Sequence, residues 1–295
     1  MQIGDMYAIG SAVVWSFSVI LMRVAGYQIP PIPLTFFKSC VALLCLYLCL
    51  LILGEELWVD LPVTDYFRLI ISAFIGISIA DSMIAAALNR LGASLQALAD
   101  CAYTPAMACI GFLMFGEMLS AWELIGGMLV VSGVFVGAAM TAEIKSTKDL
   151  WTGIFLAAAA HIIMAVGILM VRDIYREVSV LWVTSFRFVV AVVAMFAIAA
   201  IKYPKTINKK LLLGFYRPDT WITMIPMAIL GPFLATLFWI QGFKYLEAGR
   251  AAIYNQLSTV FIIFLAYILL KEKMTMRKII GVAWAFCGAL LVAFH

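Results

Sequence analysis

Long apolar runs separated by short polar segments make up nearly the whole chain. A helix that crosses a bilayer needs roughly 20 mostly apolar residues, because a rise of about 1.5 Å per residue must cover about 30 Å of hydrocarbon. Runs of this length recur along the sequence. They predict ten transmembrane helices, at residues 6–25, 33–53, 67–88, 93–114, 121–140, 151–171, 180–201, 221–243, 249–270 and 276–294.

Composition supports this pattern. Hydrophobic residues make up 65% of the 295 residues and charged residues only 12%, whereas a soluble domain carries about a quarter charged residues. So much apolar surface does not fit inside one soluble core, so we expect an all-α integral membrane protein, multi-pass in the cell membrane. The longest connections, 54–66 and 202–220, are too short to fold as a soluble domain. The net charge of +4 suits basic loops and does not indicate nucleic-acid binding.

An internal repeat divides the chain. An offset of 149 aligns Phe37-Lys38 with Phe186-Arg187, and from the third helix onward one offset of 155 aligns five pairs: Gly76 with Gly231, Leu91 with Leu246, Glu117 with Glu272, Gly126 with Gly281, and Gly133 with Gly288. We therefore expect two five-helix units, 6–140 and 150–294. With an odd number of spans each, the second unit enters the membrane inverted, an arrangement that recurs in secondary transporters.

Two pairs of segments carry a family resemblance. NRLGASLQAL with GFLMFGEMLSAWELIGGMLVVSGV, and KYLEAGRAAI with LKEKMTMRKIIGVAWAFCGALLV, resemble the two halves of an EamA-type carrier of the drug/metabolite transporter (DMT) superfamily. The resemblance covers essentially the whole chain. It implies a ten-helix fold with a central cavity between the halves, in which the fourth and ninth helices line the substrate path. Substrates of that family range over amino acids, nucleosides, drugs and sugar derivatives, so the resemblance does not fix the substrate.

A polar stripe in the predicted fourth helix is the first candidate for substrate binding. Asp100 lies near mid-depth, and Tyr103 and Thr104 follow at i+3 and i+4 on the same helix face. The offset of 155 carries this stripe to the ninth helix, at Asn255, Ser258 and Thr259. The alternative is that the stripe makes interhelical hydrogen bonds only. Trp15 in the first helix and Trp239 in the eighth are amphipathic candidates for the cavity wall.

Ionisable residues inside a bilayer are costly, so each one is a candidate functional group. Asp81 could exchange a proton during transport or neutralise Lys38, and both interpretations stay open. We expect Lys38 and Arg187 to pair with carboxylates. His161 is the only histidine inside a predicted helix, and histidine changes charge near neutral pH, so it is a second candidate for proton coupling beside a packing role.

Other chemistry finds little support. The six cysteines lie in apolar runs without a CxxC pair, which favours a packing role over disulfides or metal ligands. We expect no metal site, no cofactor and no enzymatic activity. Glycines spaced along the fifth and tenth helices, at 126, 133, 137, 281 and 288, predict close helix packing inside the protein, with dimerisation as the alternative.

The leading hypothesis is a carrier that exports a small amphipathic metabolite, an amino acid or related compound, by alternating access with proton coupling. The alternatives are a flippase for lipid-linked or lipophilic substrates and a non-transporting membrane scaffold. A multidrug-cation exporter is disfavoured, because small exporters of that type carry a glutamate in their first helix and residues 6–25 hold no acid. Expected partners are a small-molecule substrate and the lipid bilayer, with the protein a monomer or homodimer. The distribution of basic residues places both termini outside, whereas the family resemblance favours the cytoplasm.

Overall fold

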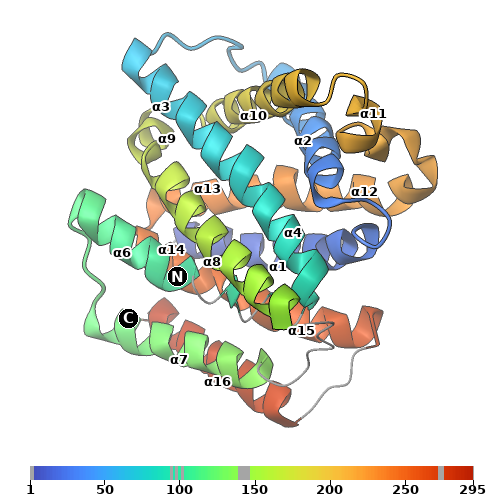
Figure 1. Ribbon diagram of the computed structural model, residues 1–295. Coiled ribbons are helices and arrows are strands. Elements are labelled where there is room, and N and C mark those ends of the chain that lie inside the picture. The colour runs from blue at the N-terminus through green and yellow to red at the C-terminus, as the bar shows by residue number, and fades with distance from the viewer. Residues whose placement is uncertain are drawn as a thin grey trace.

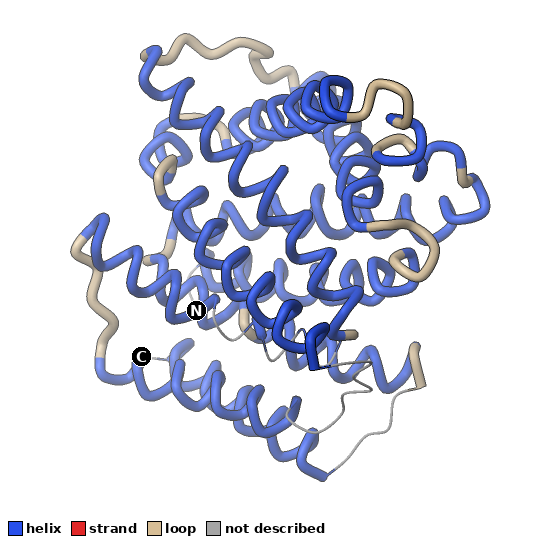
Figure 2. Tube along the Cα trace, viewed as in Figure 1, coloured by secondary structure: helices blue, strands red, loops and turns tan. Residues whose placement is uncertain are grey.

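The computed structural model describes residues 3–93, 96, 99, 100, 103–138, 147–271 and 276–294. Across these residues the regular structure is helical, with no strand (Figure 2). The helices, in chain order, are α1 Ile3–Ala25, α2 Pro31–Leu53, α3 Val63–Ala73, η1 Phe74–Ala80, α4 Asp81–Leu91, α6 Tyr103–Phe115, α7 Ala121–Ala138, α8 Thr147–Leu169, α9 Arg172–Glu177, α10 Val180–Lys202, α11 Ile207–Lys210, η3 Leu213–Tyr216, η4 Pro218–Thr220, α12 Trp221–Ala228, η5 Ile229–Ala235, α13 Thr236–Tyr245, α14 Ala248–Asn255, α15 Leu257–Leu269 and α16 Met276–Phe294. The predicted all-α class is confirmed.

Seven helical segments are long and apolar enough to cross a membrane: Ile3–Ala25, Pro31–Leu53, Val63–Leu91, Lys148–Leu169, Val180–Lys202, Pro218–Tyr245 and Ala248–Leu269. Three shorter apolar helices fall on the other three predicted segments, at Ala106–Phe115, Ala121–Gly133 and Ile279–Gly288. The predicted helix 93–114 begins among residues that lie partly outside the described ranges. Large apolar side chains such as Ile52, Ile201 and Ile222 are at least 80% exposed, as lipid-facing positions are.

Local sequence explains where α2, which carries Lys38, and α10, which carries Arg187, begin and end. Pro31 opens α2, at a position where the missing N–H costs nothing. Gly54 ends α2 in the left-handed conformation, with φ of 66°, and its N–H caps the carbonyls of the last turn. Ser179 precedes α10, and its side chain accepts a hydrogen bond from the backbone N–H of Trp182. These caps fix the register of α2 and α10.

Two membrane-length segments contain a π-helical stretch at equivalent places. η1 separates α3 from α4, and η5 separates α12 from α13. The two stretches begin 155 residues apart, which is the offset that aligns the two halves in sequence. Pro232 lies within η5 and has no N–H to donate. Because π-helical turns occur mostly at functional positions, these stretches direct attention to the residues that follow them, Asp81 and Thr236.

The first helix of each half packs mainly against helices of the other half. α1 packs against α12, η5, α13, α14 and α15, whereas α8 packs against α3, η1, α4 and α6. α2 lies beside α10 (Figure 1).

α7 and α16 form a closely packed pair at one side of the bundle (Figure 1). A Cβ on Gly288 would lie 2.5 Å from the backbone oxygen of Gly126, so the two helices touch backbone to backbone. This contact agrees with the predicted packing role of the glycines inside the protein.

The connection between α10 and α12 folds into short helical segments. It contains α11, η3 and η4, and it is held to the bundle by Leu211, which is buried against Phe36 and Met195. The Trp221 indole also donates a hydrogen bond to the Gly214 carbonyl at 3.0 Å. This connection is thus anchored to α2 and α10.

Candidate functional site

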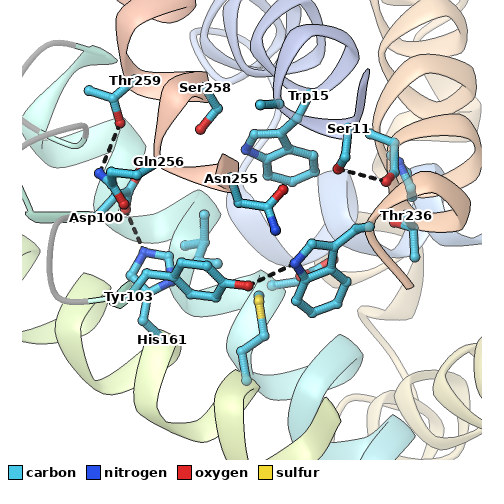
Figure 3. A pocket seen from close by; sticks show the side chains of 17 residues that line it. Ser11, Trp15, Asp100, Tyr103, His161, Thr236, Asn255, Gln256, Ser258 and Thr259 are labelled. Atoms are coloured by element: carbon cyan, nitrogen blue, oxygen red, sulfur yellow. Dashed lines mark hydrogen bonds and ion pairs between the residues drawn. The ribbon is translucent and has the colours of Figure 1, made fainter. Parts of the chain in front are cut away.

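A cavity of about 130 Å³ lies between helices of both halves (Figure 3). An engineered protein cavity of about 150 Å³ holds one benzene molecule, so this one has room for a small organic group. The lining residues are Ser11, Ala12, Trp15, Asp81, Ile84, Asp100, Tyr103, His161, Met164, Pro232, Ala235, Thr236, Trp239, Asn255, Gln256, Ser258 and Thr259. Ser11 and Trp15 fall near the middle of α1, and Ser258 falls near the middle of Ala248–Leu269, so the cavity lies at mid-depth.

Asp100 and His161 form the charged centre of the cavity. His161 Nε2 lies 2.6 Å from Asp100 Oδ1, and Gln96 Nε2 donates to the same oxygen at 2.6 Å. Asp100 Oδ2 accepts no hydrogen bond from the described part of the chain. A carboxylate only accepts, so a neutral His161 donates through Nε2 and keeps its lone pair on Nδ1, which is buried without a partner among the described residues. The pair therefore has an open position for one more proton.

Aromatic and amide side chains close the opposite wall. The Trp239 indole donates a hydrogen bond to the Tyr103 hydroxyl at 2.7 Å. This bond links α6 of the first half to α13 of the second. The Asn255 Nδ2 donor has no partner within the described ranges. The Tyr103 ring also packs edge-on against His161, with 5.5 Å between centroids.

The two predicted basic residues behave differently. Lys38 Nζ lies 2.7 Å from Asp81 Oδ2. Asp81 therefore pairs with Lys38, which is one of the two interpretations that the sequence leaves open for this carboxylate. Lys38 is buried behind the cavity wall, and Asp81 faces the cavity. Arg187 instead donates to the Tyr175 hydroxyl at 2.9 Å and forms no ion pair with an acid in the described part of the chain. The expected carboxylate partner of Arg187 is not found there.

Most of the predicted substrate-binding residues line the cavity. Thr104 does not; its Oγ1 lies 3.4 Å from Oε1 of Gln256, the residue between α14 and α15, where α6 packs against α14. Gln256, Gln96 and Ser11 are polar residues near the cavity that the sequence argument missed. Gln256 follows directly after Asn255, so it could have been predicted from the polar stripe in the ninth predicted helix. Gln96 and Ser11 match no polar residue at the repeat offset, so the repeat does not indicate them.

Ion pairs join helix ends of both halves beyond the cavity. Arg250 Nε lies 3.3 Å from Asp5 Oδ1, and Arg250 Nη1 lies 3.7 Å from Glu123 Oε1. Arg172 pairs with Glu117, which also accepts the backbone N–H of Ala248 at 2.8 Å. Asp5, Glu123 and Arg250 lie near the starts of α1, α7 and α14, Glu117 lies shortly before α7, and Arg172 is the first residue of α9. They tie these ends of the helices together on one side of the bundle.

The fold and the site define a helical multi-pass membrane protein with a cavity that residues of both halves line. A family model, described as EamA-like transporter family, matches residues 2–138 and again residues 151–294. The chain therefore belongs to the EamA-like transporter family, part of the DMT superfamily. No curated protein matches the chain. A solved structure described as "Crystal structure of protein" is similar with a TM-score of 0.78 at 16% identity, covering 98% of each chain, and this likeness concerns the fold alone.

Proposed function

We propose that the protein is a secondary transporter of the cell membrane with ten transmembrane helices arranged as two inverted five-helix repeats, 6–140 and 150–294. The proposal is supported by the two family matches, by the equivalent π-helical stretches and by the reciprocal packing of α1 and α8. Five spans per repeat would relate the halves by an axis in the membrane plane. Two packings of similar energy would then open the cavity to one side or the other.

We further propose that the cavity is the substrate site and that the protein exports a small amphipathic metabolite, an amino acid or related compound. The observation that carries this proposal is the cavity at mid-depth, which residues of both halves line and which holds polar groups among mostly apolar walls. Trp15, Tyr103 and Trp239 would hold an apolar group, and Asp100, Asn255 and Ser258 would hold polar groups. The ion-pair contact between Asp100 and His161 makes this pair the candidate for proton coupling, because Asp81 is already paired with Lys38.

Alternating access can be tested without knowing the substrate. Ser258 lines the cavity, and replacing its hydroxyl by a thiol changes the side chain little. We propose Ser258→Cys in a chain whose six native cysteines are replaced, labelled with a membrane-impermeant maleimide in right-side-out and in inside-out vesicles. Labelling from both faces is expected for a carrier. Labelling from one face only contradicts it and favours a scaffold or a fixed pocket.

A matched control is available in the same background. Asp219 is exposed and pairs with Arg217 near the start of the eighth predicted helix, away from the cavity. Asp219→Cys is expected to react from one face only. This control shows that the vesicles are sealed and oriented, so that two-sided labelling of Ser258→Cys is not caused by leakage.

A further inference from the structure

We infer that the protein binds a small monovalent inorganic anion, such as chloride, at the buried Arg187 guanidinium, outside the central cavity. Arg187 is 3% exposed and belongs to the span Val180–Lys202, about 10 Å along the helix from Val180. It does not line the cavity. The inference therefore concerns a second site, and it does not depend on the proposed transport function.

The two halves differ in how they balance this basic residue. Lys38 corresponds to Arg187 at the offset of 149, and its ammonium nitrogen lies 2.7 Å from Asp81 Oδ2. The offset of 155 places Thr236 where the first half has Asp81. The first half thus supplies a carboxylate for its buried cation, and the second half has a neutral hydroxyl at the corresponding position.

The acids on the neighbouring elements have other partners or lie at the surface. α10 packs against α2, α3, η1, α9, α11 and α13, and these elements carry three acids, Asp65, Asp173 and Glu177. Asp65 and Asp173 are both bonded to Arg68, and Glu177 is exposed. Among the described residues, no acid lies within ion-pair distance of Arg187.

The bonds that Arg187 does make leave its charge uncompensated. Its Nη1 donates to the Tyr175 hydroxyl at 2.9 Å. Burial raises the pKa of this hydroxyl to about 12, so Tyr175 stays neutral and offers a dipole without a charge. Arg187 Nε is buried and has no hydrogen-bond partner in the described ranges. At least one donor of the guanidinium is therefore open to a further ligand.

A buried guanidinium needs a negative partner. Arginine does not lose its proton in proteins, so its charge persists wherever the side chain lies. An isolated buried charge is costly, and buried charges in folded proteins are accordingly paired. With 3% exposure, the Arg187 side chain does not reach water or lipid headgroups. An anion beside Nε supplies both the missing charge and the missing acceptor.

The surroundings favour a small anion and place it between the two halves. The Nη2 atom lies against Gly76 of η1, where an added Cβ would be 3.2 Å away. This close approach suits a monatomic ion better than an organic carboxylate. Gly76 belongs to the first half, whereas Arg187 and Tyr175 belong to the second. Binding of the anion should therefore stabilise the contact between η1 and α10.

Thermal unfolding of the purified full chain tests the inference with chloride as the probe. Sodium gluconate, whose anion is bulky, is replaced stepwise by sodium chloride at constant ionic strength. The unfolding temperature is expected to rise with chloride, by equal increments for each tenfold increase once chloride exceeds its dissociation constant. Bromide should act in the same way, and its anomalous X-ray scattering in crystals should locate it beside Arg187.

Variants assign the effect to one guanidinium. Arg187→Met removes the buried charge, so it should abolish the dependence on chloride and unfold in gluconate at a temperature no lower than the wild type. Arg187→Lys keeps the charge and should keep the dependence. Arg90→Gln is the matched control, because Arg90 is exposed, and it should respond to chloride as the wild type does. If Arg187→Met is unfolded, Arg187→Lys and the position of bromide decide the question.

Three results would overturn the inference. They are equal unfolding temperatures of the wild type in chloride and gluconate, a chloride effect of the same size in Arg187→Met, and bromide found only at other places. The second of these would indicate a general salt effect. Two-sided labelling of Ser258→Cys tests the transporter proposal separately, so either proposal can fail while the other stands.

Discussion

Arg23 and Arg172 make the same kind of contact in the two halves of the chain. Arg23 Nη1 donates to the Leu88 carbonyl at 3.0 Å, in the last turn of α4. Arg172 Nε donates to the Phe243 carbonyl at 3.2 Å, in the last turn of α13. The last carbonyls of a helix have no intrahelical partners, so each guanidinium caps a helix end. Leu88 and Phe243 lie 155 residues apart, the offset that aligns the halves.

The two arginines should differ in how much each contributes to the free energy of unfolding. Arg172 is 2% exposed and also pairs with Glu117, whereas Arg23 is partly exposed. Arg172→Ala removes a buried guanidinium and leaves the partly buried Glu117 carboxylate without its cation, so we expect it to lower the free energy of unfolding by about 3 kcal/mol. Arg23→Ala should cost about 1–2 kcal/mol, the value of lost capping hydrogen bonds. Reversible unfolding in mixed micelles measures both, and an equal cost would contradict the asymmetry.

The ion pair of Lys38 and Asp81 predicts a strong coupling. Asp81→Asn should destabilise the protein by about 3–5 kcal/mol, because it leaves the buried Lys38 ammonium unpaired, and Lys38→Met should cost less, because the Asp81 carboxylate faces the cavity. The double variant should recover much of that loss, since neither charge remains. A double-mutant cycle measures the coupling. Additive effects of the two single substitutions would show that the ion pair is not the reason for their cost.

Glu247, in the connection between α13 and α14, predicts a pH effect on stability. Burial raises the pKa of this carboxyl, and the negative charges of Glu117 and Glu123 raise it further. The folded state then holds the proton more tightly than the unfolded state, so this contribution to stability is complete below the unfolded pKa and is lost as pH rises through the folded pKa.

Glu247→Gln should remove that loss. Its stability should match that of the wild type at acidic pH and exceed it at neutral pH, by a small margin because the side chain is exposed and its charge is screened. Chemical unfolding at a series of pH values from 4 to 7 measures the difference. Curves that stay parallel over this range would contradict the raised pKa.

Gly288 in α16 predicts a steric effect. An added Cβ would lie 2.5 Å from the Gly126 backbone oxygen, so Gly288→Ala must push α7 and α16 apart, at a cost of about 1–3 kcal/mol. Gly76→Ala is the matched control, because its Cβ would meet only the end of the Arg187 side chain, at 3.2 Å, which can move. A thermal unfolding comparison decides between them, and a larger loss for Gly76→Ala would contradict the packing described.

The sequence predicted the features that depend on hydrophobic periodicity and on the repeat. The helical class and the polar stripe that includes Asp100, Tyr103 and Asn255 follow from residue spacing, and these three side chains do meet at the cavity. The π-helical stretches left no such signal, because hydrogen-bond register inside an apolar helix does not change its composition. The partner of Arg187 was also missed, since the Tyr175 hydroxyl comes from a short helix outside the apolar runs.

The reciprocal packing of α1 and α8 has a consequence for biosynthesis. α3 and α4 leave the ribosome well before α8, the helix that covers them, because about 80 residues separate the ends of α4 and α8. At translation rates of about 5–20 residues per second, the first half waits roughly 4–16 s for its partner helix. During that interval α1 likewise lacks the helices against which it will finally rest. Membrane insertion can therefore proceed helix by helix, but the assembled core exists only after the second half has been synthesised.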